Sequence, residues 1–158
     1  IITEKNLKKM LDLNLLILRI SNVIGLKIKK NKRQINKTFF DNYLELVKNK
    51  SKVSYHNIFK DFISTEQLAK YLYHLINKRI TGTFNVSLGK KVFLKEILGW
   101  LNKYNKNKNK FICLKTSSIY IKKTSFTLDN NKIYKIIKYK SSKIMLKKFC
   151  LKLSKSIH

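Results

Sequence analysis

Proline is absent from this sequence of 158 residues, which also contains only four glycines and two cysteines. Cys113 and Cys150 cannot build a disulfide framework, so the sequence predicts buried free thiols in a reducing, cytoplasmic environment. The three histidines have no metal-ligand spacing, which argues against a zinc site. Since Arg19 interrupts the longest apolar run, no segment reaches the ~20 apolar residues that a membrane-spanning helix needs.

Acidic side chains are scarce as well: eight Asp and Glu stand against 36 Lys and Arg, giving a formal net charge of +28. Such a charge is typical of nucleic-acid-binding proteins, but only three of the cations are arginine, which binds phosphates and base edges as a fork. The lysines are scattered along the chain and accompany an excess of Asn and Ile, as in proteins encoded by AT-rich genomes. We therefore expect no specific nucleic-acid partner, and only weak, salt-sensitive adhesion to polyanions.

Apolar periodicity indicates the outline of the fold, and 44% hydrophobic residues are enough for a buried core. Short apolar runs indicate strands over 13–23, 53–59, 83–86 and 111–114. Helical spacing indicates helices over 3–10, 39–47, 65–76, 94–101, 130–137 and 144–153, with a loop at 26–37 and a Lys/Asn linker at 103–110. Strands that alternate with helices predict an α/β fold with parallel strand pairs.

Capping residues mark two of the predicted helix starts. Ser64, followed three residues later by Gln67, forms a capping box. The buried stripe of that helix is predicted at Leu68, Tyr71, Leu72, Leu75 and Ile76. Asp129 is expected to cap the helix that runs to Ile137.

Three short segments resemble one family in their order and spacing. Leu18–Gly25 indicates a buried strand that runs into a loop, Asp61–Ala69 a short apolar stretch before a helix, and Gly82–Ser87 a strand with a polar exit. In this order they resemble the second half of an extended short-chain dehydrogenase/reductase, the family of nucleotide-sugar epimerases, dehydratases and reductases. The first half of such an enzyme carries the dinucleotide-binding loop and the catalytic Tyr-x-x-x-Lys, and neither is expected here. We interpret the chain, which opens at Ile1, as a C-terminal piece without a catalytic residue.

The resemblance implies the last part of a Rossmann-type parallel sheet plus a small mixed α/β substrate-binding region. Residues 1–25 would end the dinucleotide-binding domain, and residues 26–158 would form the substrate-binding region, with 61–89 packing back on the Rossmann part. The implied cofactor is NAD or NADP, and the implied substrate is a nucleotide-sugar. The implied partner is the absent N-terminal half of the same protein, and the resemblance allows a homodimer of the whole enzyme.

Five residues are candidates for the site that the resemblance implies. Asn22 matches the family's asparagine that contacts the nucleotide-sugar, and Ser21, Asn22 and Val23 match the backbone beside the nicotinamide. Lys60 stands where the family usually has an arginine near the diphosphate, and Asn85 leaves a strand beside the substrate. From the residues alone, either asparagine could simply turn the chain, and Lys60 could be one solvated charge among many.

The function implied is the substrate-binding portion of an NAD(P)-dependent nucleotide-sugar epimerase or dehydratase. A 4-keto reductase of dehydrated nucleotide-sugars is the alternative within the family. From another class, a small basic protein could bind RNA or a membrane surface through Ile144–His158. Two further residues have structural expectations: Asp61 should hold a loop instead of acting in acid–base chemistry, and Gly89 should occupy a turn with positive φ.

Overall fold

The computed structural model describes residues 2–10, 15–25, 41–43, 45, 52–105 and 109–157. Its helices are α1 (Ile2–Met10), α3 (Thr65–Asn77), α4 (Leu94–Leu101), α5 (Ser118–Thr124), α6 (Asn131–Ile137) and α7 (Lys143–Ile157). Its strands are β1 (Leu16–Ile20), β2 (Asn22–Ile24), β3 (Val53–His56), β4 (Phe59–Lys60), β5 (Phe62–Ser64), β6 (Gly82–Val86), β7 (Val92–Phe93) and β8 (Phe111–Leu114). The loop predicted at 26–37 and most of the helix predicted at 39–47 lie outside the described residues.

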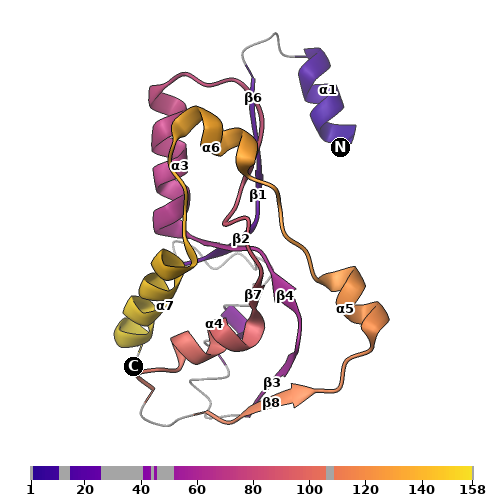
Figure 1. The fold of residues 1–158 in the computed structure, drawn as a ribbon, viewed down its shortest axis with the longest axis vertical. Coiled ribbons are helices and arrows are strands. Elements are labelled where there is room, and N and C mark those ends of the chain that lie inside the picture. The colour runs from indigo at the N-terminus through magenta and orange to yellow at the C-terminus, as the bar shows by residue number, and fades with distance from the viewer. Residues whose placement is uncertain are drawn as a thin grey trace.

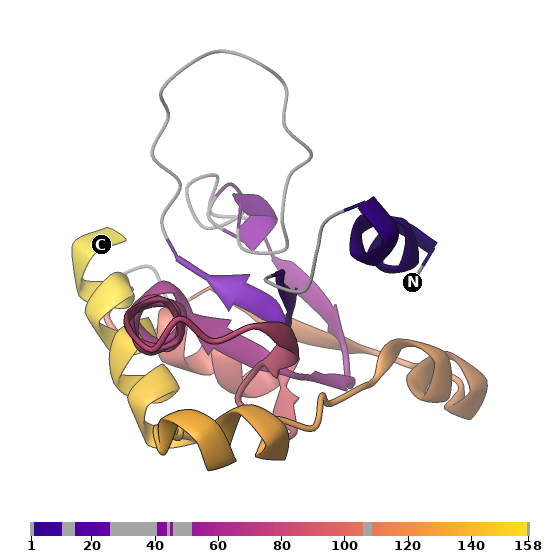
Figure 2. The same cartoon turned by 90° about the horizontal axis from the view of Figure 1, so that it is seen from above.

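The described strands form four pairs, which confirm the predicted α/β class. The pairs β1–β6, β2–β5 and β3–β8 are parallel, and β4–β7 is antiparallel. Helices α3 and α6 lie beside the β1–β6 pair, whereas α4 lies beside β7 and packs against α7 in the lower half of the view (Figure 1). Seen from above, α1 and α5 project away from this body (Figure 2).

The strand predicted over 13–23 divides into β1 and β2 at Ser21. The Ser21 N–H donates to Val86 O at 3.1 Å, whereas the next N–H, of Asn22, donates to Asp61 O at 3.2 Å. The chain thus changes its strand partner within one residue, which a hydrophobicity pattern does not reveal. The prediction of a buried strand is wrong at the end of β1. Ile20 is 45% exposed there, and β6 is the one strand paired with β1 among the described residues.

The helix α3 begins where the capping box predicted. The Ser64 hydroxyl accepts the Gln67 N–H, and Gln67 Oε1 accepts the Ser64 N–H, both at 3.1 Å. The buried line of the helix runs through Gln67, Tyr71 and Leu75 at intervals of four residues. Ile76 lies beside this line and is 65% exposed, so its predicted place in the buried stripe is wrong.

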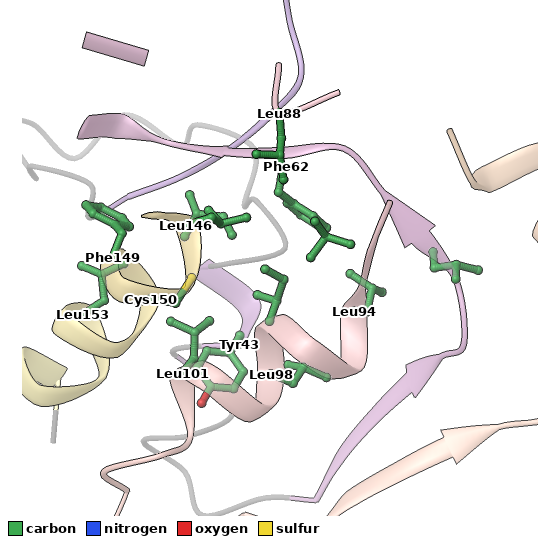
Figure 3. Packing of buried hydrophobic residues seen from close by; sticks show 14 of the residues in the cluster. Tyr43, Phe62, Leu88, Leu94, Leu98, Leu101, Leu146, Phe149, Cys150 and Leu153 are labelled. Atoms are coloured by element: carbon green, nitrogen blue, oxygen red, sulfur yellow. The ribbon is translucent and has the colours of Figure 1, made fainter. Parts of the chain in front are cut away.

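The larger of the two apolar cores lies between α4 and α7 (Figure 3). Both helices contribute apolar faces, and residues from the strands and loops cover them. Cys150 is fully buried there, and burial raises the pKa of its thiol to about 12. Both cysteines are free, as predicted, but Cys113 is exposed on β8 and not buried, because β8 keeps three of its four residues exposed.

The second core lies between the β1–β6 pair and helices α3 and α6, and its buried members are Ile63, Tyr71, Leu75, Phe84, Val86, Ile133 and Ile137. The helix α6 that closes this core has Asn130 as its N-cap, so the prediction of Asp129 as the cap is wrong by one residue. Asp129 Oδ1 nevertheless accepts the Asn131 N–H at 2.9 Å, which gives the first turn a polar partner.

The basic helix α7 uses its apolar face inside the protein. Leu146, Phe149, Cys150 and Leu153 are all buried in the larger core. Two of its lysines pair with acids of other helices: Lys143 with Glu96 of α4 at 2.8 Å and Lys152 with Glu66 of α3 at 2.9 Å. The apolar face is therefore not available to a membrane surface or to RNA. No helix within the described ranges has the length and apolarity required to cross a membrane.

Leu146→Ala is expected to lower the free energy of unfolding by ~2–5 kcal/mol, because it removes fully buried methyl groups and leaves a cavity. Ile144→Ala, two residues earlier on the same helix, is the matched control, since Ile144 is 68% exposed and its loss should change stability little. Urea denaturation followed by circular dichroism measures both. Equal effects of the two substitutions would contradict the position of α7 against α4.

Candidate functional site

The candidate site begins at Ser21, where the chain leaves β1. Ligands of open α/β sheets bind beyond the carboxyl ends of the strands, and β1 and β6 both end here. Ser21 is 8% exposed, and its hydroxyl has no hydrogen-bond partner among the described residues. A buried hydroxyl without a partner is costly, so this oxygen is a candidate to bind an additional polar group.

Asn22, the next residue, is tied to Asp61. Its side-chain Nδ2 donates to Asp61 O at 2.9 Å, and the same carbonyl accepts the Asn22 N–H. Both donors of the tie are therefore used to join β2 to the segment before β5, while Oδ1 accepts no hydrogen bond from the described residues. Val23 follows in β2, paired with Ile63, and is 39% exposed.

Asp61 joins two further segments to this point. Its carboxylate is fully buried and accepts the N–H groups of Leu88 (2.9 Å), Gly89 (3.0 Å) and Leu128 (3.1 Å). Burial raises the pKa of Asp61 above its ordinary value, and these three hydrogen bonds oppose that rise only in part. The expectation that Asp61 holds a loop is confirmed.

The segment after β6 is fixed by several side chains. Asn85 Nδ2 donates to Asp129 O at 2.7 Å, and the Ser87 hydroxyl donates to Leu128 O at 3.2 Å. Gly89 has φ = 69°, as predicted, and a Cβ there would lie 2.7 Å from Asn130 Oδ1, so only glycine fits. The structure thus brings three of the sequence segments together: the exit of β1, the stretch at Asp61, and the exit of β6.

Lys60 lies away from these hydrogen bonds, toward the segment after α5. Its Nζ is 5.9 Å from the centre of the Phe126 ring, and Phe126 is 40% exposed. The N–H of Phe59, the residue before Lys60, is 3.4 Å from the Ser125 hydroxyl that accepts it. Lys60 is half-buried, and its ammonium group lies near an aromatic face that attracts a cation.

The structure also reveals an apolar and aromatic face that the sequence did not predict. In the parallel pair β3–β8, Ser54 is opposite Ile112 and His56 is opposite Leu114, so these four side chains share one face. The Tyr120 ring from α5 lies 4.8 Å from the His56 ring on the same face. The alternation of side chains in 53–56 predicts which residues share one face of β3. It does not predict that β8 pairs with β3 or that Tyr120 lies on this face.

The spacing of the family's catalytic pair does occur in this sequence, at Tyr104–Lys108, Tyr134–Lys138 and Tyr139–Lys143. The prediction that this sequence contains no Tyr-x-x-x-Lys is therefore wrong. The two pairs within the described residues do not act as pairs: Lys140 lies over the Tyr134 ring and Lys70 over the Tyr139 ring, in place of the lysines four residues on. With 36 Lys and Arg in the chain, such spacings arise by chance.

No group of three or more His, Cys, Asp or Glu side chains that could hold a metal ion exists within the described ranges.

No protein-family model and no curated protein sequence matches the chain. Solved structures do match it over nearly its whole length.

Three of these structures show the extent of the likeness. The UDP-N-acetylglucosamine 4-epimerase from Bacillus cereus has a TM-score of 0.63 and 14% identity, and the match covers 99% of this chain and 50% of that one. The UDP-N-acetylglucosamine 4-epimerase from Methanobrevibacter ruminantium, in complex with UDP-N-acetylmuramic acid, has a TM-score of 0.68, 16% identity and coverages of 98% and 49%. The Bordetella bronchiseptica enzyme WbmG, in complex with NAD, has a TM-score of 0.69, 19% identity and coverages of 97% and 46%.

The chain therefore spans about half the length of the solved structures it matches. Identities of 14–19% are too low to carry a specific activity over, but the TM-scores establish a common fold. The parallel strand pairs and the order of elements are those that the sequence resemblance implied. The chain has the fold of about half of these UDP-N-acetylglucosamine 4-epimerases and of WbmG, which is the fold that its resemblance to the extended short-chain dehydrogenases/reductases implied.

Proposed function

We propose that this chain is the nucleotide-sugar-binding portion of an NAD(P)-dependent epimerase or dehydratase. The observation that supports the proposal best is the meeting of the β1 exit, Asp61 and the β6 exit at one end of the parallel strands. In this fold, that end is where ligands bind. Three of the matched structures contain a UDP-sugar or UDP, which makes a uridine nucleotide the first ligand to test.

The proposed roles follow from the hydrogen-bonding groups, charges and ring faces that each side chain does not use within the described residues. Asn22 Oδ1 would accept a hydrogen bond from the sugar or nucleotide, because its Nδ2 is used by Asp61 O. Lys60 would neutralise a phosphate as a point charge. The rings of His56 and Tyr120 would stack against a base, as aromatic faces do in nucleotide sites. Asn85 has the weaker claim, since its Nδ2 holds Asp129 O.

The nicotinamide side of the site would involve Ser21, Asn22 and Val23. A buried Ser21 hydroxyl without a partner among the described residues, next to a part-exposed Val23, fits a polar ring edge placed against this strand exit. The bound nicotinamide would supply hydride transfer to or from a sugar carbon. Ser21, Asn22 and Val23 would bind and orient it, while the acid–base residues of the reaction would come from the other half of the enzyme.

Two finer choices stay within this proposal. A 4-keto reductase would use the same substrate side, because the outcome at the sugar carbon is decided in the catalytic half. The whole enzyme would join this chain to an N-terminal half, as a monomer or a homodimer. Two free cysteines agree with a reducing, cytoplasmic location.

Substitution of Asn22 and Lys60 tests the proposal in this chain. Asn22→Ala should weaken binding of UDP or a UDP-sugar by ~1–3 kcal/mol, the loss of a hydrogen bond to a buried group. Lys60→Ala should weaken it less at high salt than at low salt, because a point charge on phosphate is screened. Lys60→Arg should restore affinity, since Arg also binds phosphate. Titration calorimetry at two salt concentrations measures all three.

Lys148→Ala is the matched control, because Lys148 is an exposed lysine on the outer side of α7. It should leave nucleotide affinity unchanged at either salt concentration. Suppose that Lys60→Ala and Lys148→Ala behave identically and that Asn22→Ala keeps the parental affinity. Both residues would then be removed from the site, and the structural role of Asn22 as the link to Asp61 O would remain.

A further inference from the structure

Asp61 is the buried residue on which the segments of the candidate site converge. Its carboxylate binds three backbone N–H groups, two from the β6 exit and one from the segment before α6. The donors lie 27, 28 and 67 residues away in the sequence. A fully buried carboxylate with this many donors holds its own residue in one orientation.

The main chain of the same residue holds Asn22. Asp61 O accepts both the Asn22 N–H and Nδ2, at 3.2 and 2.9 Å. Because the carboxylate is held by three N–H groups and the carbonyl by the Asn22 N–H, the residue is anchored at both its side chain and its main chain, which limits the directions that the carbonyl can take. That direction decides how the Asn22 amide is turned, and therefore where its Oδ1 points.

We propose that Asp61 is the positioning residue of the site: its carboxylate fixes the carbonyl that orients the Asn22 amide toward the nucleotide-sugar. An amide in place of the carboxylate would set an NH₂ group against one of the three N–H donors and release that segment. The identity of the ligand rests on the proposed function, whereas the coupling between Asp61 and Asn22 rests on the hydrogen bonds alone.

Asp129 provides a matched control. Its carbonyl also accepts an asparagine side chain, Nδ2 of Asn85, and its carboxylate also accepts a backbone N–H, that of Asn131. The difference is that Asp129 is exposed and its carboxylate has one backbone donor where Asp61 has three. If any loss of a carboxylate near the site weakened binding, both Asp61→Asn and Asp129→Asn would show the effect. An effect that comes from positioning Asn22 would appear only in Asp61→Asn.

The test compares Asp61→Asn and Asp129→Asn in this chain, by nuclear magnetic resonance of the Asn22 side-chain amide and by UDP affinity. Asp61→Asn should shift the Asn22 NH₂ signals and weaken UDP binding about tenfold, and Asp129→Asn should do neither. In the double variant with Asn22→Ala, the loss from Asp61→Asn should disappear, because residues that act together are not additive. Additive losses, or unshifted Asn22 signals, would overturn the proposal.

Two further outcomes are informative. If the parent chain binds no UDP, the proposed function fails, and the Asn22 signals still decide whether Asp61 positions Asn22. If Asp61→Asn does not fold, amide exchange in the parent decides instead: the N–H groups of Asn22, Leu88, Gly89 and Leu128 should open as one unit. Exchange of Leu128 that is independent of the other three would overturn the proposal.

Discussion

No turnover is expected when this chain alone is mixed with NAD or NADP and a panel of UDP-sugars. Its four glycines, at positions 25, 82, 89 and 99, are too far apart to form a dinucleotide-binding loop. Tyr134 and Tyr139 each have a lysine four residues later in the sequence, but the lysines that lie over their rings are Lys140 and Lys70. Without a positioned acid–base group the reaction loses ~10²–10⁴-fold in rate, and without a held nicotinamide the hydride has no acceptor.

Coupled detection of product sugar and absorbance of reduced cofactor measure this turnover directly. A full-length UDP-N-acetylglucosamine 4-epimerase of the matched fold, assayed in the same buffers, shows that the assay works. Cofactor-dependent turnover by the isolated chain would contradict the proposal that its catalytic residues lie in another half. It would also direct attention back to Tyr104, Tyr134 and Tyr139.

Binding to polyanions is expected to be weak, independent of the nucleotide sequence, and lost at moderate salt. A formal net charge of +28 attracts any polyanion, and a protein with 6–10 phosphate contacts loses roughly 10³–10⁵ in affinity between ~50 and ~200 mM salt. The rings under several lysines are already used inside the protein: Lys91 lies over Phe59, Lys95 over Phe93 and Lys132 over Phe84. Those ring faces do not lie open for bases to stack on.

Fluorescence anisotropy with poly(U), poly(A) and a mixed-sequence RNA over a salt series measures the effect. Equal affinities for the three RNAs, with one common salt slope, are the expected result. Heparin is the control, because it offers charge without bases. Tight binding to one RNA that survives ~150 mM salt would favour the alternative of a small RNA-binding protein.

Local features of this fold could be predicted from the sequence wherever neighbouring residues determine them. The capping box at Ser64 and Gln67 and the positive φ of Gly89 both depend on short stretches of chain. The order of the three segments, around Asn22, Asp61 and Asn85, was enough to indicate the family of folds. These features can be recognised in a sequence of unusual composition because few other residues satisfy the same backbone geometry.

Contacts between distant segments could not be predicted in the same way. The division of the first strand at Ser21 depends on Asp61 O, which replaces β6 as hydrogen-bond partner one residue later. Cys113 is exposed because three of the four residues of β8 are exposed to solvent. The apolar sequence of β8 predicts the opposite, a buried strand. Tyr120 lies beside His56 because β3 pairs with β8 and α5 follows β8. The periodicity within β3 or within α5 does not predict this contact.

The burial of Asp61 also has a consequence for the order in which the chain folds. Its three hydrogen bonds close loops of 27, 28 and 67 residues, and the entropy of closing such loops is lost before the bonds can form. A carboxylate is costly to bury before its donors arrive, so this junction should be made after α3 and the strand pairs β2–β5 and β1–β6 have formed. Because the chain has no proline, a slow refolding phase would report this closure and not prolyl isomerisation.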